Sequence, residues 1–286
     1  MSENALSVEV FLKVPSPSYH PLLAYAKDRN RRGPDQYEWS RGALQGLVNR
    51  FPYSKEVLQE YVLALLEQGD AVDAEAALKQ LQLKFGDRNE ESLCRWGRLF
   101  KDEGDKFAGL PWYLKDKRNR DLNKSITFYE RALKSYEAAY RIREGHYPGI
   151  NVAALLLILG GMLTETGADG KGRRDESRRF ATDLLGTREK WPLDYGDEDR
   201  DLWHPATAGE AYLVLEKSED AAREYGTVLK SPKLNWHARQ SMYRQVVRVC
   251  GALKSFRVDA EAPFDEPAKF FQVDQLKDDA AKTKSP

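Results

Sequence analysis

The chain has 286 residues, of which 45 are basic and 45 acidic, so its formal net charge at pH 7 is zero. A neutral chain has no global electrostatic field that would draw it to nucleic acid or anionic lipid, so either partner would need a local patch. Cys94 and Cys250 lie too far apart in sequence to indicate a disulfide framework or a metal-binding pair, and the N-terminal residues lack a basic, apolar leader. We therefore expect a cytoplasmic protein with free thiols.

The first 36 residues are expected to form an extension that precedes a helical-repeat domain of residues 37–257. Residues 7–14 alternate apolar and polar side chains, which predicts a short strand. Residues 19–33 predict a short helix with a basic end. Residues 37–51 predict a helix that caps the repeat array, because no earlier helix lies at repeat spacing.

Two helix hairpins are predicted. Residues 54–87 predict one, since apolar side chains recur three and four positions apart on both sides of Gly69 and Asp70. Residues 201–232 predict the other, with the small, aromatic, alanine, aromatic, small spacing of a tetratricopeptide repeat. The residues at these positions are Gly209, Tyr212, Ala221, Tyr225 and Val228. Each hairpin leaves an apolar face that only a stacked neighbour covers, so the sequence predicts an all-α solenoid in a right-handed superhelical array.

Between the hairpins, residues 91–103 and 123–142 predict two helices, and residues 108–121 interrupt the helical period as an insertion. Residues 150–163 form the longest apolar run. We expect a buried helix there rather than a membrane span, because a span needs about 20 apolar residues. Further predicted elements are a helix over 176–190, a capping helix over 235–253, and a charged tail over 258–286 whose last ten residues are disordered.

Residues 146–151, HYPGIN, predict a turn that joins two packed helices. Pro148 restricts the backbone and Gly149 frees it, a combination that suits a turn. Tyr147 is expected to pack back on the preceding helix. Asn151 is expected to cap the first amide groups of the next helix.

Residues 128–160, FYERALKSYEAAYRIREGHYPGINVAALLLILG, resemble the TRAF-binding domain family. That family is the helical-repeat central regulatory region of the apoptosis signal-regulating kinases, and it has bacterial relatives. The resemblance rests on an aromatic–alanine helix, the turn residues 147–151 and an alanine- and leucine-rich helix. Residues 202–229 are similar to the family's next helix pair, so the likeness covers about residues 91–229. Kinase motifs are missing from the sequence. The resemblance implies a scaffold or regulatory module in signalling that binds proteins.

The sequence offers no catalytic constellation, and we predict that the protein is not an enzyme and uses no cofactor. The four histidines, His20, His146, His204 and His237, are scattered without the close spacing that a metal site requires. Motifs for a serine nucleophile or a phosphate-binding loop are not found in the sequence. No metal site is predicted either.

The predicted function is the binding of a protein or peptide partner through the concave face of the helical array. In the repeat frame, the first helix of each hairpin lines that face. The predicted groove residues are Glu56, Gln59, Leu63 and Leu66 in the first hairpin, and Trp203, Ala206, Glu210 and Leu213 in the later one. They mix apolar anchors with carboxylates, as a groove for a peptide or a partner helix would. The sequence names neither the partner nor the oligomeric state.

An alternative function is nucleic-acid or nucleotide sensing through the insertion. Residues 112–120 combine aromatic and basic side chains, the mixture that stacks on bases and neutralises phosphates. The residues concerned are Trp112, Tyr113, Lys115, Lys117, Arg118 and Arg120. The neutral net charge disfavours nucleic acid, and the two aromatic rings could instead anchor the loop while the basic run is solvated.

Overall fold

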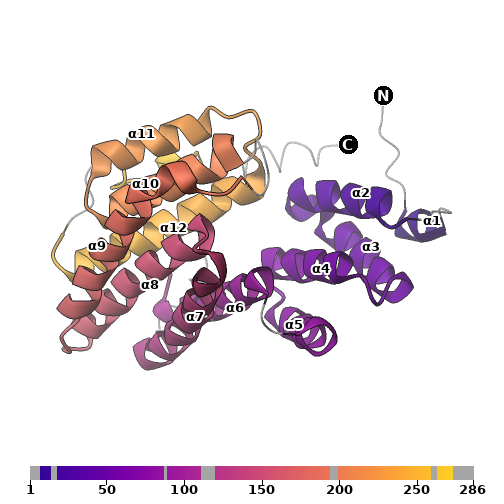
Figure 1. The fold of residues 1–286 in the computed structure, drawn as a ribbon, viewed down its shortest axis with the longest axis horizontal. Coiled ribbons are helices and arrows are strands. Elements are labelled where there is room, and N and C mark those ends of the chain that lie inside the picture. The colour runs from indigo at the N-terminus through magenta and orange to yellow at the C-terminus, as the bar shows by residue number, and fades with distance from the viewer. Residues whose placement is uncertain are drawn as a thin grey trace. The chain divides into compact units, whose positions relative to one another are not determined.

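The computed structural model describes residues 7–13, 18–86, 89–110, 120–193, 199–258 and 263–272. These residues contain helices and no strand, which confirms the prediction of an all-α fold (Figure 1). The chain forms two compact units. Unit 1 comprises Met1–Leu99 and Asn235–His237, and unit 2 comprises Phe100–Leu234 and Ala238–Pro286. The predicted repeat domain of residues 37–257 stays a prediction.

The described residues of unit 1 form five α-helices, the first part of a sixth, the single turn η1 (Pro34–Gln36) and the first two residues of α12 (Trp236–Ser255). The five helices and the sixth are α1 (Val8–Lys13), α2 (His20–Arg31), α3 (Tyr37–Arg50), α4 (Lys55–Gln68), α5 (Ala71–Phe85) and the start of α6 (Glu90–Ala108). α3 packs against α1, α2 and α4, and α4 packs against α5. The core includes Leu44, Leu65 and Leu78, together with Phe11 and Leu23 from the predicted N-terminal extension. The prediction that residues 37–51 cap the array is therefore wrong, because α1 and α2 pack against α3.

The segment predicted as a short strand forms helix α1. Val8 and Leu12 lie one helical turn apart and face Gly42 and Gly46 of α3. Phe11 is buried on the same side, against the ring of Trp39 at a centroid distance of 5.1 Å. A helix places residues three and four apart on one side, whereas a strand would divide them between two faces. Over so few residues, an alternation of apolar and polar side chains does not distinguish a helix from a strand.

The hairpin predicted over residues 54–87 is confirmed as α4 and α5. The Ser54 hydroxyl accepts a hydrogen bond from the amide of Val57 at 3.3 Å and so caps α4. Gly69 ends α4 with a φ of 77°, which glycine adopts without strain. The Asp70 carboxylate then caps α5 by accepting from the amide of Asp73 at 3.1 Å. Gly69 thus ends one helix and Asp70 caps the next, as their residue types predict.

The described residues of unit 2 form the rest of α6 and seven further α-helices, of which α12 has its first two residues in unit 1. They are α7 (Leu122–Arg143), α8 (His146–Glu165), α9 (Lys171–Gly186), α10 (His204–Val214), α11 (Ser218–Leu229), α12 (Trp236–Ser255) and α13 (Pro267–Phe270), with single helical turns η4 (Arg188–Lys190) and η5 (Asp199–Trp203). α8 packs against α7, α9 and α10. In the predicted tail, residues 263–272 are ordered around α13, and the predicted disorder of the last ten residues lies outside the described residues.

The same kind of close contact occurs in two helix pairs of unit 2. A Cβ atom placed on Gly209 of α10 would lie 3.0 Å from the ring of Tyr225 on α11. One placed on Gly104 of α6 would lie 3.0 Å from the ring of Tyr129 on α7. Tyr225 follows Gly209 by 16 residues and Tyr129 follows Gly104 by 25, a difference that the insertion at 108–121 explains. The tetratricopeptide spacing therefore reflects a ring that packs on a glycine.

Helix α8 is the most apolar helix of the described chain. By length and composition it could cross a membrane, since it has 20 residues rather than the 14 of the apolar run. However, 83% of its most apolar window is buried inside the structure, against α7, α9 and α10. Its apolar surface is thus covered by the protein itself, as in a core helix.

The turn predicted at 146–151 is wrong, because these residues form the first turns of α8. The chain reverses earlier, at Glu144 with a φ of 54° and at Gly145, which occupies the N-cap position. Pro148 is tolerated because the first turn of a helix has amide groups without intrahelical acceptors. Asn151 caps nothing; its amide donates to the Tyr147 carbonyl at 2.9 Å. One expectation holds, since the ring of Tyr147 contacts Tyr136 of α7.

The junction between α8 and α9 yields a prediction about stability. A Cβ on Gly170 would overlap the carbonyl oxygen of Gly160, whereas one on Gly172 meets nothing within 4 Å. We expect Gly170→Ala to lower the free energy of unfolding by about 1–3 kcal/mol through overpacking. Gly172→Ala should leave stability unchanged or raise it by up to about 1 kcal/mol. Urea unfolding monitored by circular dichroism measures both, and equal effects would contradict the close contact.

Candidate functional site

Unit 1 has a pocket of about 860 Å³ at the N-terminal end of α4. Four segments meet there: the residue before α2, the connection between α3 and α4, the first turns of α4, and the start of α6. The lining residues are Tyr19, Arg50, Phe51, Pro52, Tyr53, Ser54, Lys55, Glu56, Gln59, Asn89 and Glu91. We refer to this site as the α4 pocket.

The connection between α3 and α4 is held at both ends. Phe51 leaves the helical conformation, with φ of −127° and ψ of 60°, while its amide still donates to the carbonyl of Leu47. The Ser54 amide donates to the Phe51 carbonyl at 3.0 Å, and its hydroxyl caps α4. Lys84 of α5 donates to the Pro52 carbonyl at 3.0 Å. The loop therefore presents its side chains from a fixed backbone.

Aromatic side chains form one wall of the α4 pocket. The rings of Tyr19 and Phe51 lie 5.6 Å apart between centroids. Tyr53 is 84% exposed, although it lies on the ordered loop. A large exposed ring on a fixed backbone loses little entropy when a partner covers it, as in many protein-binding sites.

The charged side chains around the α4 pocket are unevenly paired. Glu56 lies 3.5 Å from the imidazole of His20, and Glu91 lies 2.6 Å from the guanidinium of Arg95. Lys55 has no ion-pair or hydrogen-bond partner among the residues that the structure describes. The ammonium group of Lys55 is thus available to a negatively charged group of a ligand.

The predicted groove residues divide into two groups. Glu56 and Gln59 line the α4 pocket, and Leu63 lies partly buried further along α4. The later hairpin does not offer a groove: Trp203 is partly buried, whereas Ala206, Glu210 and Leu213 are buried, as is Leu66 in the first hairpin. The reason is that α10 packs against α8, α9 and α11, so hardly any of its surface remains for a partner. Ala206, Glu210 and Leu213 are therefore not exposed to a partner, and the remaining groove residues stay a prediction.

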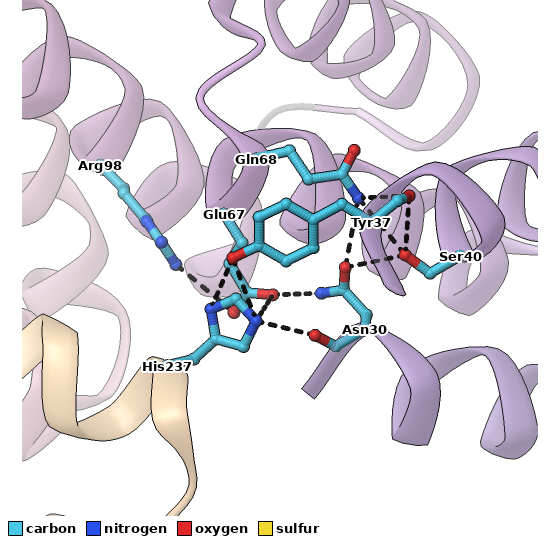
Figure 2. Close-up of polar contacts among 7 residues, drawn as sticks. All are labelled: Asn30, Tyr37, Ser40, Glu67, Gln68, Arg98 and His237. Carbon is cyan, nitrogen blue, oxygen red and sulfur yellow. Dashed lines mark hydrogen bonds and ion pairs between the residues drawn. The ribbon is translucent and has the colours of Figure 1, made fainter. Parts of the chain in front are cut away.

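A buried polar network that the sequence analysis missed lies at the other end of α4 (Figure 2). Asn30 is its centre: the side-chain amide donates to Glu67, and the side-chain oxygen accepts from Ser40 at 3.1 Å and Gln68 at 3.2 Å. The imidazole of His237 lies 2.8 Å from the Asn30 backbone carbonyl. Every polar group of Asn30 thus has a partner, which points to a structural role.

A second buried network joins four helices of unit 2. The Lys101 ammonium group on α6 donates to Asn151 on α8 at 2.6 Å and to Gln245 on α12 at 3.3 Å. The amide of Gln245 donates to Glu210 on α10 at 2.7 Å. Burial and the charge of Arg248 lower the pKa of Lys101 to about 8. Burial raises the pKa of Glu210 to about 7, against the opposing charge of Lys101.

Arg248 extends this network to α7. Its guanidinium donates to Gln245 at 2.9 Å and to Asp105 at 2.9 Å. The hydroxyl of Tyr129 donates to the same carboxylate at 2.5 Å. A buried ion pair is stable only when its remaining donors and acceptors are satisfied, and here neighbouring helices supply them. We assign both networks to the packing of the helices.

The alternative basic patch lies almost wholly outside the described residues: Trp112, Tyr113, Lys115, Lys117 and Arg118 are not described. Arg120 is, and its guanidinium donates to the Ala108 carbonyl at 3.1 Å and pairs with Glu165. The part of the chain that the structure describes contains no group of three or more His, Cys, Asp or Glu side chains that could hold a metal ion.

The fold and the repeated glycine–tyrosine contact define a tetratricopeptide-like helical-repeat protein. Residues 36–156 match the family described as Tetratricopeptide Repeats-Sensor, a stretch from α3 into α8 that is less than half of the chain. No curated protein matches the chain. The narrower likeness to the TRAF-binding domain stays a prediction, and its residues 147–151 lie in helix α8.

The network of unit 2 predicts a pH dependence of stability. The folded state binds the proton of Glu210 up to about pH 7, whereas the unfolded state releases it near 4.5, so folding loses stability as the pH rises between these values. Lys101 has the opposite effect, because between about pH 8 and 10.5 the unfolded state holds the proton that the folded state has released. The folded state therefore gains stability as the pH rises through this range. The slope for one proton is at most about 1.4 kcal/mol per pH unit.

Urea unfolding of the wild type, Glu210→Gln and Lys101→Met over pH 4 to 10 tests this dependence. Glu210→Gln should remove the loss of stability that occurs as the pH rises to about 7. Lys101→Met should remove the gain in stability that occurs as the pH rises above about 8. Parallel curves for all three proteins would contradict the placement of these groups.

Proposed function

We propose that the protein is a non-enzymatic scaffold or regulatory module that binds a segment of another protein at the α4 pocket. One observation carries the proposal: Tyr53 stands exposed on an ordered loop, beside an aromatic wall and the ammonium group of Lys55, for which the described residues provide no ion-pair partner. Tetratricopeptide-like repeats generally mediate protein–protein interactions, which supports it. A role in signalling rests on the resemblance to the TRAF-binding regulatory region and on the word sensor in the family's description.

The chemistry of the pocket indicates the kind of partner segment. An aromatic or large apolar side chain would pack on Tyr19, Phe51 and Tyr53, since aromatic rings dominate the energy of such contacts. A neighbouring carboxylate would pair with Lys55. The carboxylates of the pocket do not oppose this, because Glu56 and Glu91 already have basic neighbours.

The cysteines support the proposal of a cytoplasmic, non-catalytic protein. Neither Cys94 nor Cys250 forms a disulfide bond. Burial raises the pKa of Cys250 to about 12, so its thiol stays protonated and unreactive at physiological pH. Cys94 is also buried, as a structural cysteine of a reducing compartment would be.

Photo-crosslinking in the native cell tests the site. The residue Tyr53 is replaced by p-benzoylphenylalanine, and the control carries the same replacement at Leu83 of α5, which is equally exposed at 86%. We expect the residue-53 probe to capture a defined protein, identified by mass spectrometry, that the residue-83 probe does not capture.

The charge of the pocket is tested in the same experiment. Lys55→Glu should reduce the yield of the crosslinked partner at least about tenfold, which corresponds to about 1.4 kcal/mol of binding free energy. The reason is that the substitution sets a negative charge against the carboxylate of the partner. Lys79→Glu on α5, whose side chain is 62% exposed, is the matched control and should have no effect. Equal capture from both probe positions, or a yield that Lys55→Glu leaves unchanged, would refute the assignment of the α4 pocket.

A further inference from the structure

The C-terminal part of the described chain inserts two phenylalanines into unit 2. Residues 263–272 form a turn followed by the four-residue helix α13. Phe264 and Phe271 flank this helix and are 1% and 0% exposed. Their ring centroids lie 6.0 Å and 5.3 Å from that of Tyr225 on α11, and both meet it edge to face. The segment therefore covers an aromatic site that α11 presents.

Few polar contacts hold this segment. The guanidinium of Arg239 on α12 donates to the backbone carbonyl of Phe271 and to the side chain of Gln272, both at 3.2 Å. Within the described residues, the remaining charged side chains of the segment pair with one another or face solvent, as Lys269 does with Glu266 at 3.1 Å. α13 itself has no buried residue. The attachment thus depends on two rings and one guanidinium.

An attachment of this kind resembles a bound peptide more than a repeat helix. The two buried rings are seven residues apart, on either side of a single helical turn, and the backbone carbonyl of the second accepts from an arginine. Elements held by so few contacts open at lower free energy than the helices that they cover. The covalent connection to α12 keeps the segment at a high effective concentration, which explains why a weakly held segment stays in place.

We propose that the surface over Tyr225 is a second peptide-binding site, and that residues 263–272 occupy it as an internal ligand. A partner's segment that carries two phenylalanines seven residues apart, with acidic residues after the first, competes for the same site. The site is independent of the α4 pocket, since it lies in unit 2 and uses other residues. Partner binding at this site requires that the internal segment leave it.

The test uses the full chain with Phe264→Ala and Phe271→Ala, which empties the site without changing Tyr225 or Arg239. The probe is a fluorescent peptide of the sequence of residues 263–272, PFDEPAKFFQ. By fluorescence anisotropy, we expect the peptide to bind the double variant at least tenfold more tightly than the wild type, whose site is occupied. A peptide with alanine in place of both buried phenylalanines should bind neither. Equal binding to the two proteins, or binding to neither, overturns the proposal.

Hydrogen exchange of the wild-type chain gives a second measurement that does not require the variant to fold. The amides of Phe270 and Phe271 donate within α13, to Glu266 and Pro267. If the segment is an internal ligand, these amides exchange at least tenfold faster than the amides of α11, because the segment opens while the hairpin stays closed. If the amides of α13 and α11 exchange at the same rate, the segment is part of the core and the proposal fails.

Discussion

The organisation of unit 2 depends on a steric constraint, the packing of a tyrosine ring on a glycine of the facing helix. Tyr225 lies on Gly209, and Tyr129 lies on Gly104, with the same closest approach of 3.0 Å to the position of an added Cβ. A Cβ atom at either glycine would require the tyrosine ring to move by a few tenths of an ångström. Close approach brings the remaining facing surfaces together, so polar groups between the helices lose water and must pair with one another. An example is the buried carboxylate of Asp105 on α6, which accepts from the hydroxyl of Tyr129 at 2.5 Å.

The sequence predicted those parts of the fold in which local chemistry and packing agree. The ends of α4 and α5 are set by the side chains or backbone of Ser54, Gly69 and Asp70 themselves. The α4–α5 hairpin could therefore be predicted from the local sequence alone. Gly209 and Tyr225 could be found from their spacing. Gly104 could have been found as well, but the insertion before α7 shifts its partner by nine positions and hides the repeat.

Other parts could not be predicted, because they depend on contacts between distant residues. Whether Pro148 and Gly149 turn the chain or begin a helix is decided by what covers α8, which the local sequence does not state. The burial of Glu210 has the same origin, since α10 is enclosed by helices from three other parts of the chain. A carboxylate on a helix normally indicates a solvated face, and here the partner Gln245 lies 35 residues away. For this reason Glu210, which the sequence analysis placed in the groove, is buried.

We place the proposed function at the α4 pocket, where the helices are not enclosed by other helices. The α4 pocket forms where a connection and the starts of α4 and α6 meet. It combines exposed aromatic surface with the ammonium group of Lys55, which has no ion-pair partner in the described part of the chain. The most direct measurement is a selection of random peptides displayed on phage against the purified chain. The account predicts selected peptides with an aromatic or large apolar residue beside an acidic one, and loss of their binding to the Lys55→Glu protein. Peptides that bind the Lys55→Glu protein as well as the wild type would contradict it.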